Sequence, residues 1–404
     1  MKRLAWKSLY GVLLFTLVPS LYSQIDDSRR ELIQLGYNQQ FVGHAPLSAY
    51  AFYFLNQPNF YRSNVTLRLA VAPVYLDSEV GFTSFFGPNT HLGVGLSGGG
   101  YADSYSEIRG GKWWREESFT GHGGGASVGI YHLFNPGQRI PLYGIVRNEL
   151  HYTLFERDEE TMPSFILPND RLNYHFRAGF RWGGREPVMT PALAMELSAW
   201  YEGQFRTGSG IYGFGDRKVN PDSHLFWTRG LIAYTFPERK DNVALNLTLG
   251  TSLNVDRFSA YRLGGVLPLA SEFPLSLPGY YYQEINAEQF VLLGGAYTWQ
   301  INELWSWLFQ AATAGVDYPP GLQQPGHFHS GVGTGVGFRS PSGASHVILS
   351  YGYGIDALRT HGRGSHSIGL LFQFDFERTP YHIYEPGENP LRSRGLERLF
   401  NFAH

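Results

Sequence analysis

Residues 171–183 read Arg-Leu-Asn-Tyr-His-Phe-Arg-Ala-Gly-Phe-Arg-Trp-Gly, with an apolar residue at every second position. Successive side chains of a β-strand point to opposite faces, so this stretch predicts a strand with one apolar face and one polar, partly cationic face. A tilted strand needs roughly 9–11 residues to cross a bilayer, and this stretch is long enough. It indicates a strand of a transmembrane β-barrel, with lipid on one face and water on the other.

The same alternation recurs in about fifteen segments between residues 46 and 377, and no helical period of about 3.6 residues interrupts them. A soluble, secreted all-β protein is the alternative, because the half-buried strands of soluble sheets also alternate. Strand length and the aromatic residues at strand ends favour the membrane barrel.

The composition fits one large barrel. Of the 404 residues, 16% are aromatic and 49 are glycine, the residue types of interfacial girdles and close strand contacts. A mean hydropathy of −0.22 excludes a bundle of transmembrane helices. The net charge of −2 gives no reason to expect a nucleic-acid partner. The absence of cysteine excludes disulfides and sulfur-ligated metal sites.

Residues 1–23 have the features of a cleaved secretory signal peptide. Lys2 and Lys7 lie in a positive segment, residues 9–21 are mostly apolar but too short to span a membrane, and Ser23 suits a cleavage site. A signal peptide followed by amphipathic strands predicts an integral protein of the outer membrane of a didermal bacterium.

Loop parity predicts the number of strands. If the chain starts in the periplasm, each external loop follows an odd number of strands. Ten clear strands precede the longest loop and five follow it, so the weakly alternating residues 31–42 are expected to form an additional first strand. Residues 24–379 are thus predicted to form an all-β, antiparallel barrel of sixteen strands, with fourteen as the alternative, and residues 380–404 a periplasmic tail.

The longest loop reads Tyr-Arg-Leu-Gly-Gly at residues 261–265 and Leu-Pro-Gly-Tyr at residues 277–280. It resembles the sixth external loop of the BamA/TamA-type outer-membrane assembly and transport barrels, the bacterial surface antigen superfamily. In that family an Arg-Leu-Gly-Gly-like entry leads to an Arg-Gly-Phe or Arg-Gly-Tyr tip, and five strands follow. Residues 347–354 and 367–376 resemble the last two strands of the family.

The resemblance implies a barrel that helps proteins or lipids insert into or cross the outer membrane. Its partners would be outer-membrane lipid and unfolded outer-membrane or secreted proteins. The mechanism would use a lumenal loop and a weak seam between the first and last strands, and weak pairing of residues 31–42 is expected at that seam. The loop residues that the resemblance assigns to the lumen are Arg262, Leu263, Gly264, Gly265, Gly279 and Tyr280.

Three features depart from the family pattern. Pro278 replaces the tip arginine, which in the family pairs with acidic residues on a nearby strand. Residues 296–298 read Ala-Tyr-Thr where many members have Glu-Tyr-Arg. Too few residues are expected between Gln24 and the barrel for periplasmic client-binding domains. A porin-like diffusion channel and a structural surface antigen therefore remain alternatives.

Charged residues on three consecutive predicted strands are expected to face the lumen. Opposite charges on neighbouring strands indicate either a charged constriction of a conduit or a structural network that rigidifies the wall. The residues are Arg147, Glu149, Arg177, Arg181, Glu196 and Glu202.

No motif predicts catalysis, and no cofactor is expected. Gly95-Leu-Ser97-Gly-Gly99 matches a nucleophile elbow, but it lies in an alternating strand without the following helix that this motif requires. His327 and His329 share one face of a predicted strand and could ligate a metal with a third partner. The alternative, which we favour, is a pair of solvated histidines at the edge of an external loop.

Overall fold

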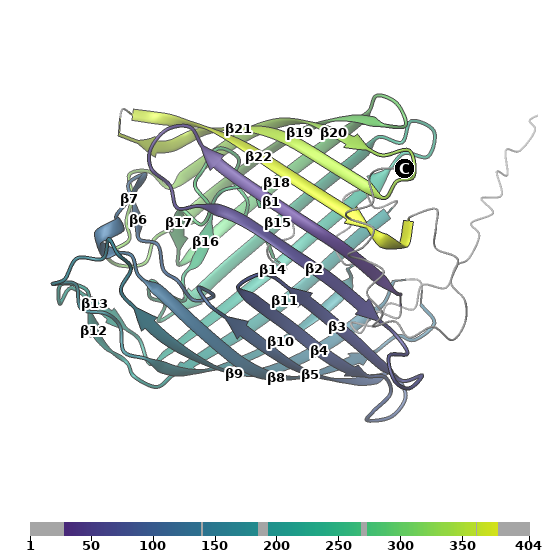
Figure 1. The fold of residues 1–404 in the computed structure, drawn as a ribbon, viewed down its shortest axis with the longest axis horizontal. Coiled ribbons are helices and arrows are strands. Elements are labelled where there is room, and N and C mark those ends of the chain that lie inside the picture. The colour runs from purple at the N-terminus through teal and green to yellow at the C-terminus, as the bar shows by residue number, and fades with distance from the viewer. Residues whose placement is uncertain (1–27, 139, 185–192, 268–272, 361, 379–404) are drawn as a thin grey trace, which may run out of the picture.

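The computed structural model describes residues 28–138, 140–184, 193–267, 273–360 and 362–378. Sixteen strands form one closed antiparallel barrel in which each strand pairs with the next along the chain and β22 pairs with β1 (Figure 1). This confirms the predicted all-β barrel and its strand number. The predicted signal peptide (residues 1–23) and tail (residues 380–404) lie outside the described residues.

The elements of the barrel follow chain order. Its strands are β1 (Arg30–Gln40), β2 (Ser48–Gln57), β3 (Val65–Val71), β4 (Tyr75–Phe82), β5 (Thr90–Gly99), β8 (Thr120–Leu133), β9 (Leu142–Glu156), β10 (Arg171–Gly183), β11 (Leu193–Arg206), β14 (Asp222–Thr235), β15 (Asn242–Leu253), β18 (Gln289–Gln300), β19 (Trp305–Asp317), β20 (Phe328–Arg339), β21 (Ser345–Arg359) and β22 (Gly362–Asp375). Shorter elements are β6 (Ile108–Arg109), β7 (Lys112–Trp113), η1 (Arg115–Glu117), β12 (Gly210–Tyr212), β13 (Arg217–Val219), β16 (Tyr261–Leu263), β17 (Ile285–Ala287) and η2 (Phe376–Arg378).

The alternating sequence produces the two faces of the wall. In β10, the eighth barrel strand, Leu172, Phe180 and Trp182 point outward and are 39%, 57% and 42% exposed. Arg177 on the other face pairs with Glu202 of β11 inside the barrel. An outer band of exposed apolar side chains suits the hydrocarbon core of a bilayer. Among the described residues, no helix is both long and apolar enough to cross a membrane.

The two ends of the barrel differ. One end, at the left of Figure 1, carries the hairpins β6–β7 and β12–β13, and we call it the loop end. The other end carries short connections such as residues 301–304 and 340–344, and we call it the turn end. The expectation of weak pairing for the first strand is wrong, because β1 pairs with β22 at nine consecutive positions, from Leu32 with Asp375 to Gln40 with Ser367.

Candidate functional site: the lumen loop and the charged wall

The described residues of the connection between β15 and β18, 254–267 and 273–288, lie inside the barrel, and we call them the lumen loop. Its two arms pair as the β16–β17 hairpin, with Leu263 opposite Ile285. Leu263, Leu277 and Tyr280 are completely buried. They belong to one apolar cluster with inward-facing side chains of the wall, namely Tyr131, Tyr143, Ile145, Trp200, Leu225, Trp227, Phe290, Leu292, Ala314 and Val316.

The entry segment of the lumen loop holds its two arms together. Arg262 donates a hydrogen bond to the carbonyl of Ser106 at 3.3 Å, so it contacts the connection after β5. Gly264 has a φ of +154°, and a Cβ atom there would collide with the backbone of Tyr281. Gly265 donates its N–H to the carbonyl of Tyr281 at 2.8 Å. The two glycines of the Arg-Leu-Gly-Gly segment therefore have no room for a side chain, because the returning arm of the loop packs directly against them.

The tip of the lumen loop packs on glycine-lined strands. Gly279 has a φ of +82°, and a Cβ atom there would collide with the backbone of Gly354 in β21. A Cβ atom at Gly331 in β20 would likewise collide with the carbonyl of Pro278. Gly331 in β20 and Gly352 and Gly354 in β21 thus leave room for the backbone of the tip to lie directly on these strands.

A buried ion pair joins the lumen loop to the wall. Arg359, at the loop end of β21, contacts Glu284 of the loop, with Nη1 to Oε1 at 2.7 Å and Nη2 to Oε2 at 3.1 Å. Both side chains are at most 2% exposed. Burial raises the pKa of the Glu284 carboxyl, and the Arg359 guanidinium opposes this shift. The guanidinium also lies 3.8 Å from the ring centroid of Tyr281.

This pair reverses the charges that the family resemblance implies. There the loop supplies an arginine and the wall supplies the acid, whereas here Pro278 stands at the tip, Glu284 follows it in the loop and Arg359 comes from the wall. Arg359 was not predicted, because the strand pattern recognised in the sequence covers only residues 347–354. The structure extends β21 to Arg359 through an irregularity between Gly354 and Leu358.

The lumen loop also contacts the first strand. Gln40 at the end of β1 donates from Nε2 to the carbonyl of Tyr280, and the Tyr281 hydroxyl donates to the carbonyl of Val42 at 3.0 Å. Because Arg359 of β21 holds the same segment, the loop reaches from β21 past β22 to β1. We call these strands, together with β20, the docked wall.

His327 lies just before β20 and His329 lies within it, and the two histidines have different surroundings. His329 is 2% exposed, with Nε2 2.7 Å from the Tyr318 hydroxyl and Nδ1 3.4 Å from the Tyr280 hydroxyl. The expectation of two solvated histidines is therefore wrong for His329, because the lumen loop covers it. His327 is exposed and lies 3.5 Å from Asp317. Within the described ranges, no three metal-binding side chains come together.

The predicted lumenal charges lie on the inner faces of β9, β10 and β11, which we call the charged wall. Arg177 Nη2 is 2.7 Å from Glu202 Oε2, and Arg181 Nε is 3.7 Å from Glu196 Oε1. Arg147 donates to Ser127 at 3.1 Å. A polar cavity of about 220 Å³ is lined by Tyr75, Asp77, Ser97, Arg147, Glu149, His175, Arg177 and Glu202.

The charged wall and the lumen loop meet at Phe273. Its ring centroid lies 5.5 Å from Trp200 and 5.6 Å from Trp227, and these two indoles are stacked on each other. The guanidinium groups of Arg181 and Arg229 lie 5.6 and 5.7 Å from the same ring. Aromatic pairs and cation–π contacts therefore surround Phe273, a residue that sequence analysis did not select.

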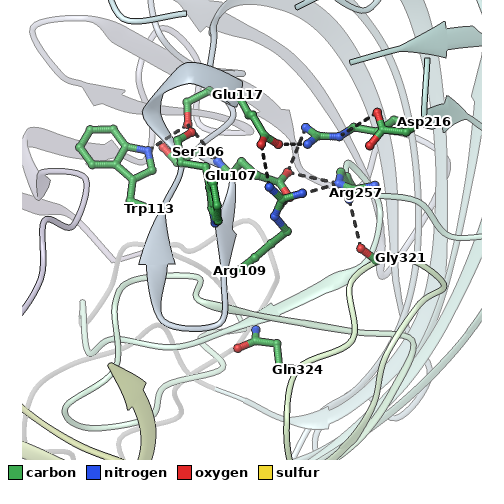
Figure 2. A network of polar contacts seen from close by, with 12 residues as sticks. Ser106, Glu107, Arg109, Trp113, Glu117, Asp216, Arg257, Gly321 and Gln324 are labelled. Carbon is green, nitrogen blue, oxygen red and sulfur yellow. Dashed lines mark hydrogen bonds and ion pairs between the residues drawn. The ribbon is translucent and has the colours of Figure 1, made fainter. Parts of the chain in front are cut away.

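A second polar network ties the connections at the loop end together (Figure 2). Glu107 is completely buried and lies 3.3 Å from Arg109, 3.5 Å from Arg217 and 3.2 Å from Arg257. Glu117 contacts Arg109 at 2.7 Å and also contacts Arg217. Burial lowers the pKa of the Arg217 guanidinium to about 10. This network joins the connection after β5, the β12–β13 hairpin and the lumen loop.

The β6–β7 hairpin extends this assembly across the mouth of the barrel. A Cβ atom at Gly111 would collide with the carbonyl of Leu358, at the end of β21. The hairpin follows β5, which lies six strands from β21 around the wall by way of β1. The loop end is therefore bridged by backbone that packs against the same strand that carries Arg359.

The fold and this site define a sixteen-stranded barrel with a loop packed into its lumen. No protein-family profile and no curated protein sequence matches the chain. Solved structures do match. CdiB from Acinetobacter baumannii has a TM-score of 0.56 at 9% identity, over 86% of this chain and 60% of that one. CdiB from Escherichia coli has a TM-score of 0.56 at 10% identity, over 85% of this chain and 63% of that one.

BamA from Haemophilus ducreyi lacking POTRA domains 1–3 has a TM-score of 0.52 at 12% identity, over 85% of this chain and 71% of that one. The barrel thus has the fold of BamA and CdiB, as the loop motif implied. The chain spans about 60% of the length of the CdiB structures.

Proposed function

We propose that this protein assists the insertion or translocation of polypeptides at the outer membrane of a didermal bacterium. Its clients would be unfolded outer-membrane or secreted proteins, and its loop end would face the outside of the cell. The observation that carries the proposal is the lumen loop, which is fixed inside the barrel by the buried Glu284–Arg359 pair and bridges the strands on both sides of the closure.

The packing of the lumen loop favours this function over passive diffusion. The loop shares an apolar cluster with inward-facing residues of β8, β9, β11, β14, β18 and β19. The interiors of diffusion channels are polar and water-filled, so an apolar, packed lumen does not suit a permanently open pore. If the docked loop can also take a second position, its movement would link the passage of a client through the lumen to a change in the wall.

A diffusion channel is the second candidate, and the charged cavity favours it. Opposite charges such as Arg177 and Glu202 along one lumenal wall can select among small solutes. If this function applies, the purified protein conducts ions across planar bilayers, and the current changes in discrete steps. Substitution of Arg177 and Arg181 by alanine then changes the ion selectivity.

A charge-swap experiment tests the proposed assembly function. Glu284→Arg and Arg359→Glu should each lower the amounts of other barrel proteins in the envelope, because each places two like charges at a buried site. The double variant E284R/R359E should restore them in part. The matched control is the exposed pair Arg115–Glu160, at 2.6 Å, in which the same reversals should have no effect. The proposal would be contradicted by a single variant in which the loop has left its docked position while the amounts of other barrel proteins stay normal.

A further inference from the structure

The polar cavity beside the charged wall lies in a part of the barrel that the lumen loop does not fill. Its volume is about 220 Å³, and its lining residues belong to β4, β5, β9, β10 and β11. The inner faces of β5 and β8 consist largely of glycine, so few side chains project into this space. The atoms nearest to a Cβ atom at Gly95 of β5 belong to Ser127 and Ser78 of the wall, whereas at Gly331 of β20 they belong to Pro278 of the loop tip. The barrel thus has two glycine-lined inner surfaces, and the loop covers one of them.

The cavity is bounded on both sides along the barrel axis. Towards the loop end, Asp103 Oδ2 of the connection after β5 lies 2.8 Å from both His151 Nε2 and Thr153 Oγ1 of β9. Towards the turn end, Ile145 and Tyr143 of the same strand belong to the apolar cluster. The cavity therefore suits a ligand that is held there better than a solute that passes through. Its volume corresponds to about seven water molecules at ~30 Å³ each, so the ligand is small.

The charged groups of β10 and β11 at the cavity are already paired with each other. Glu202 accepts hydrogen bonds from Arg177 and Gln204, both at 2.8 Å, and lies 3.5 Å from His175. A ligand would have to break these contacts to bind Glu202. Recognition of a charged ligand therefore depends on the groups of β4 and β9 on the other side of the cavity.

Arg147 of β9 lines the cavity and is a cation without an acidic partner. It donates to the Ser127 hydroxyl at 3.1 Å, and its Nε is buried and has no hydrogen-bond partner among the described residues. Buried donors in folded proteins nearly always have an acceptor, and a guanidinium binds a carboxylate through two parallel N–H groups. The unused N–H of Arg147 therefore indicates a position for a carboxylate.

Two carboxylates lie on either side of one serine at the same cavity. Asp77 of β4 pairs across the ladder with Ser97 of β5, and the Ser97 hydroxyl donates to Glu149 of β9 at 3.3 Å. The cationic neighbours of these acids are near the limit of ion-pair distance, since Arg68 lies 3.7 Å from Asp77 and His151 lies 3.9 Å from Glu149. Like charges in a half-buried site repel each other, and an ammonium group between them would remove this repulsion.

We propose that the cavity binds a small zwitterion, with its carboxylate on Arg147 and its ammonium group between Glu149 and Asp77. Arg147 and Glu149 are two residues apart on one face of β9, so their positions differ by about 7 Å along the strand. Two extended residues of a peptide span about 7 Å as well. The ligand class is therefore a dipeptide with both termini free, of which glycylglycine is the smallest. The site contains no residue of the lumen loop, so it goes beyond the proposed assembly function and is tested apart from it.

Isothermal titration calorimetry of the full chain in nanodiscs with glycylglycine tests the site. We expect saturable binding of one molecule per chain. N-Acetylglycylglycine lacks the ammonium group and glycylglycinamide lacks the carboxylate. Each should bind at least about tenfold more weakly, because each loses one charge-assisted contact. The absence of saturable glycylglycine binding, or equal binding of all three compounds, would overturn the proposal.

Single substitutions locate the ligand in the cavity. Arg147→Gln and Glu149→Gln should each weaken glycylglycine binding about tenfold, because each removes one charged contact. Unchanged gel mobility of the folded barrel checks that both variants fold. The matched control Arg115→Gln changes an exposed arginine at the loop end and should leave binding unchanged. An equal loss in the control, or no loss in folded cavity variants, would overturn the proposed site.

A charge exchange separates recognition of the ligand from general damage to the wall. The double variant R147E/E149R places the cation and the acid at each other's position on the same face of β9. It should bind glycylglycine in the reversed orientation, and more tightly than Arg147→Glu or Glu149→Arg alone, because the two positions act as one site. Binding to the double variant that is no tighter than binding to the single variants would overturn the assigned contacts.

Discussion

The docked wall and the charged wall face the same lumen and are built on different principles. The docked wall is lined by glycines that let the backbone of the lumen loop approach closely, and it holds the loop with one buried ion pair. The charged wall holds two arginine–glutamate pairs beside a polar cavity and contacts the loop mainly at Phe273. The difference indicates that the loop is fixed at its tip and more easily released at Phe273.

The largest expected effect is at the buried pair. Arg359→Ala leaves the Glu284 carboxylate buried without its partner, which should cost about 3–5 kcal/mol of the free energy of unfolding. Urea denaturation followed by gel mobility measures this loss. The control Arg115→Ala removes an exposed partner and should cost less than about 1 kcal/mol. Equal losses in the two variants would remove the distinction between the docked wall and a surface ion pair.

The next effect is at the tip of the lumen loop. Gly279→Ala should destabilise the barrel by about 1–3 kcal/mol, because alanine is strained at a φ of +82° and its Cβ collides with β21. Gly230→Ala in β14 is the control, since a Cβ atom there meets nothing within 4 Å. A change at Gly279 no larger than at Gly230 would show that the tip is not docked.

A smaller effect is expected at Phe273. Phe273→Leu should lose about 0.5–1.5 kcal/mol, because leucine retains apolar contact but loses the aromatic and cation–π interactions. Limited proteolysis of the lumen loop in the folded protein measures its release. Cleavage should increase in Phe273→Leu more than in Phe214→Leu, a control at the exposed β12–β13 connection. Unchanged cleavage would mean that the charged wall does not hold the loop.

The smallest effect is expected within the charged wall. Arg177→Ala should lower the free energy of unfolding less than Arg359→Ala does, because the Arg177 side chain is about one-third exposed to the lumen and Glu202 keeps its hydrogen bond from Gln204. Thermal unfolding followed by gel mobility checks this. A loss as large as that of Arg359→Ala would mean that the charged wall is a structural core.

The alternation of apolar residues was sufficient to predict the barrel. The sequence of each strand indicates its two faces, so residues 171–183 already indicated an inward Arg177 and an outward Trp182. The pairing of β1 could not be predicted in this way, because its stability depends on the lumen loop and on β22, which lie more than 200 residues away in sequence.

The loop motif indicated a lumenal position only through resemblance, and the residues that hold the loop were not visible. Arg359 and Glu284 are separated by 74 intervening residues, and neither belongs to a local pattern. Glu107 at the loop end is similar, since two of its three arginine partners, Arg217 and Arg257, come from distant segments. Such contacts exist only after the barrel has closed.

The central claim is that the tip of the lumen loop lies on the docked wall beside the closure. Disulfide formation between Pro278→Cys and Ser367→Cys tests it, because a Cβ atom at Gly352 would contact both Ser367 Oγ and the backbone of Pro278. The control pair is Pro278→Cys with Ser97→Cys, which lines the cavity beside the charged wall. The account predicts rapid cross-linking of the first pair in intact membranes and none of the second. Cross-linking of both pairs at equal rates, or of neither, would contradict it.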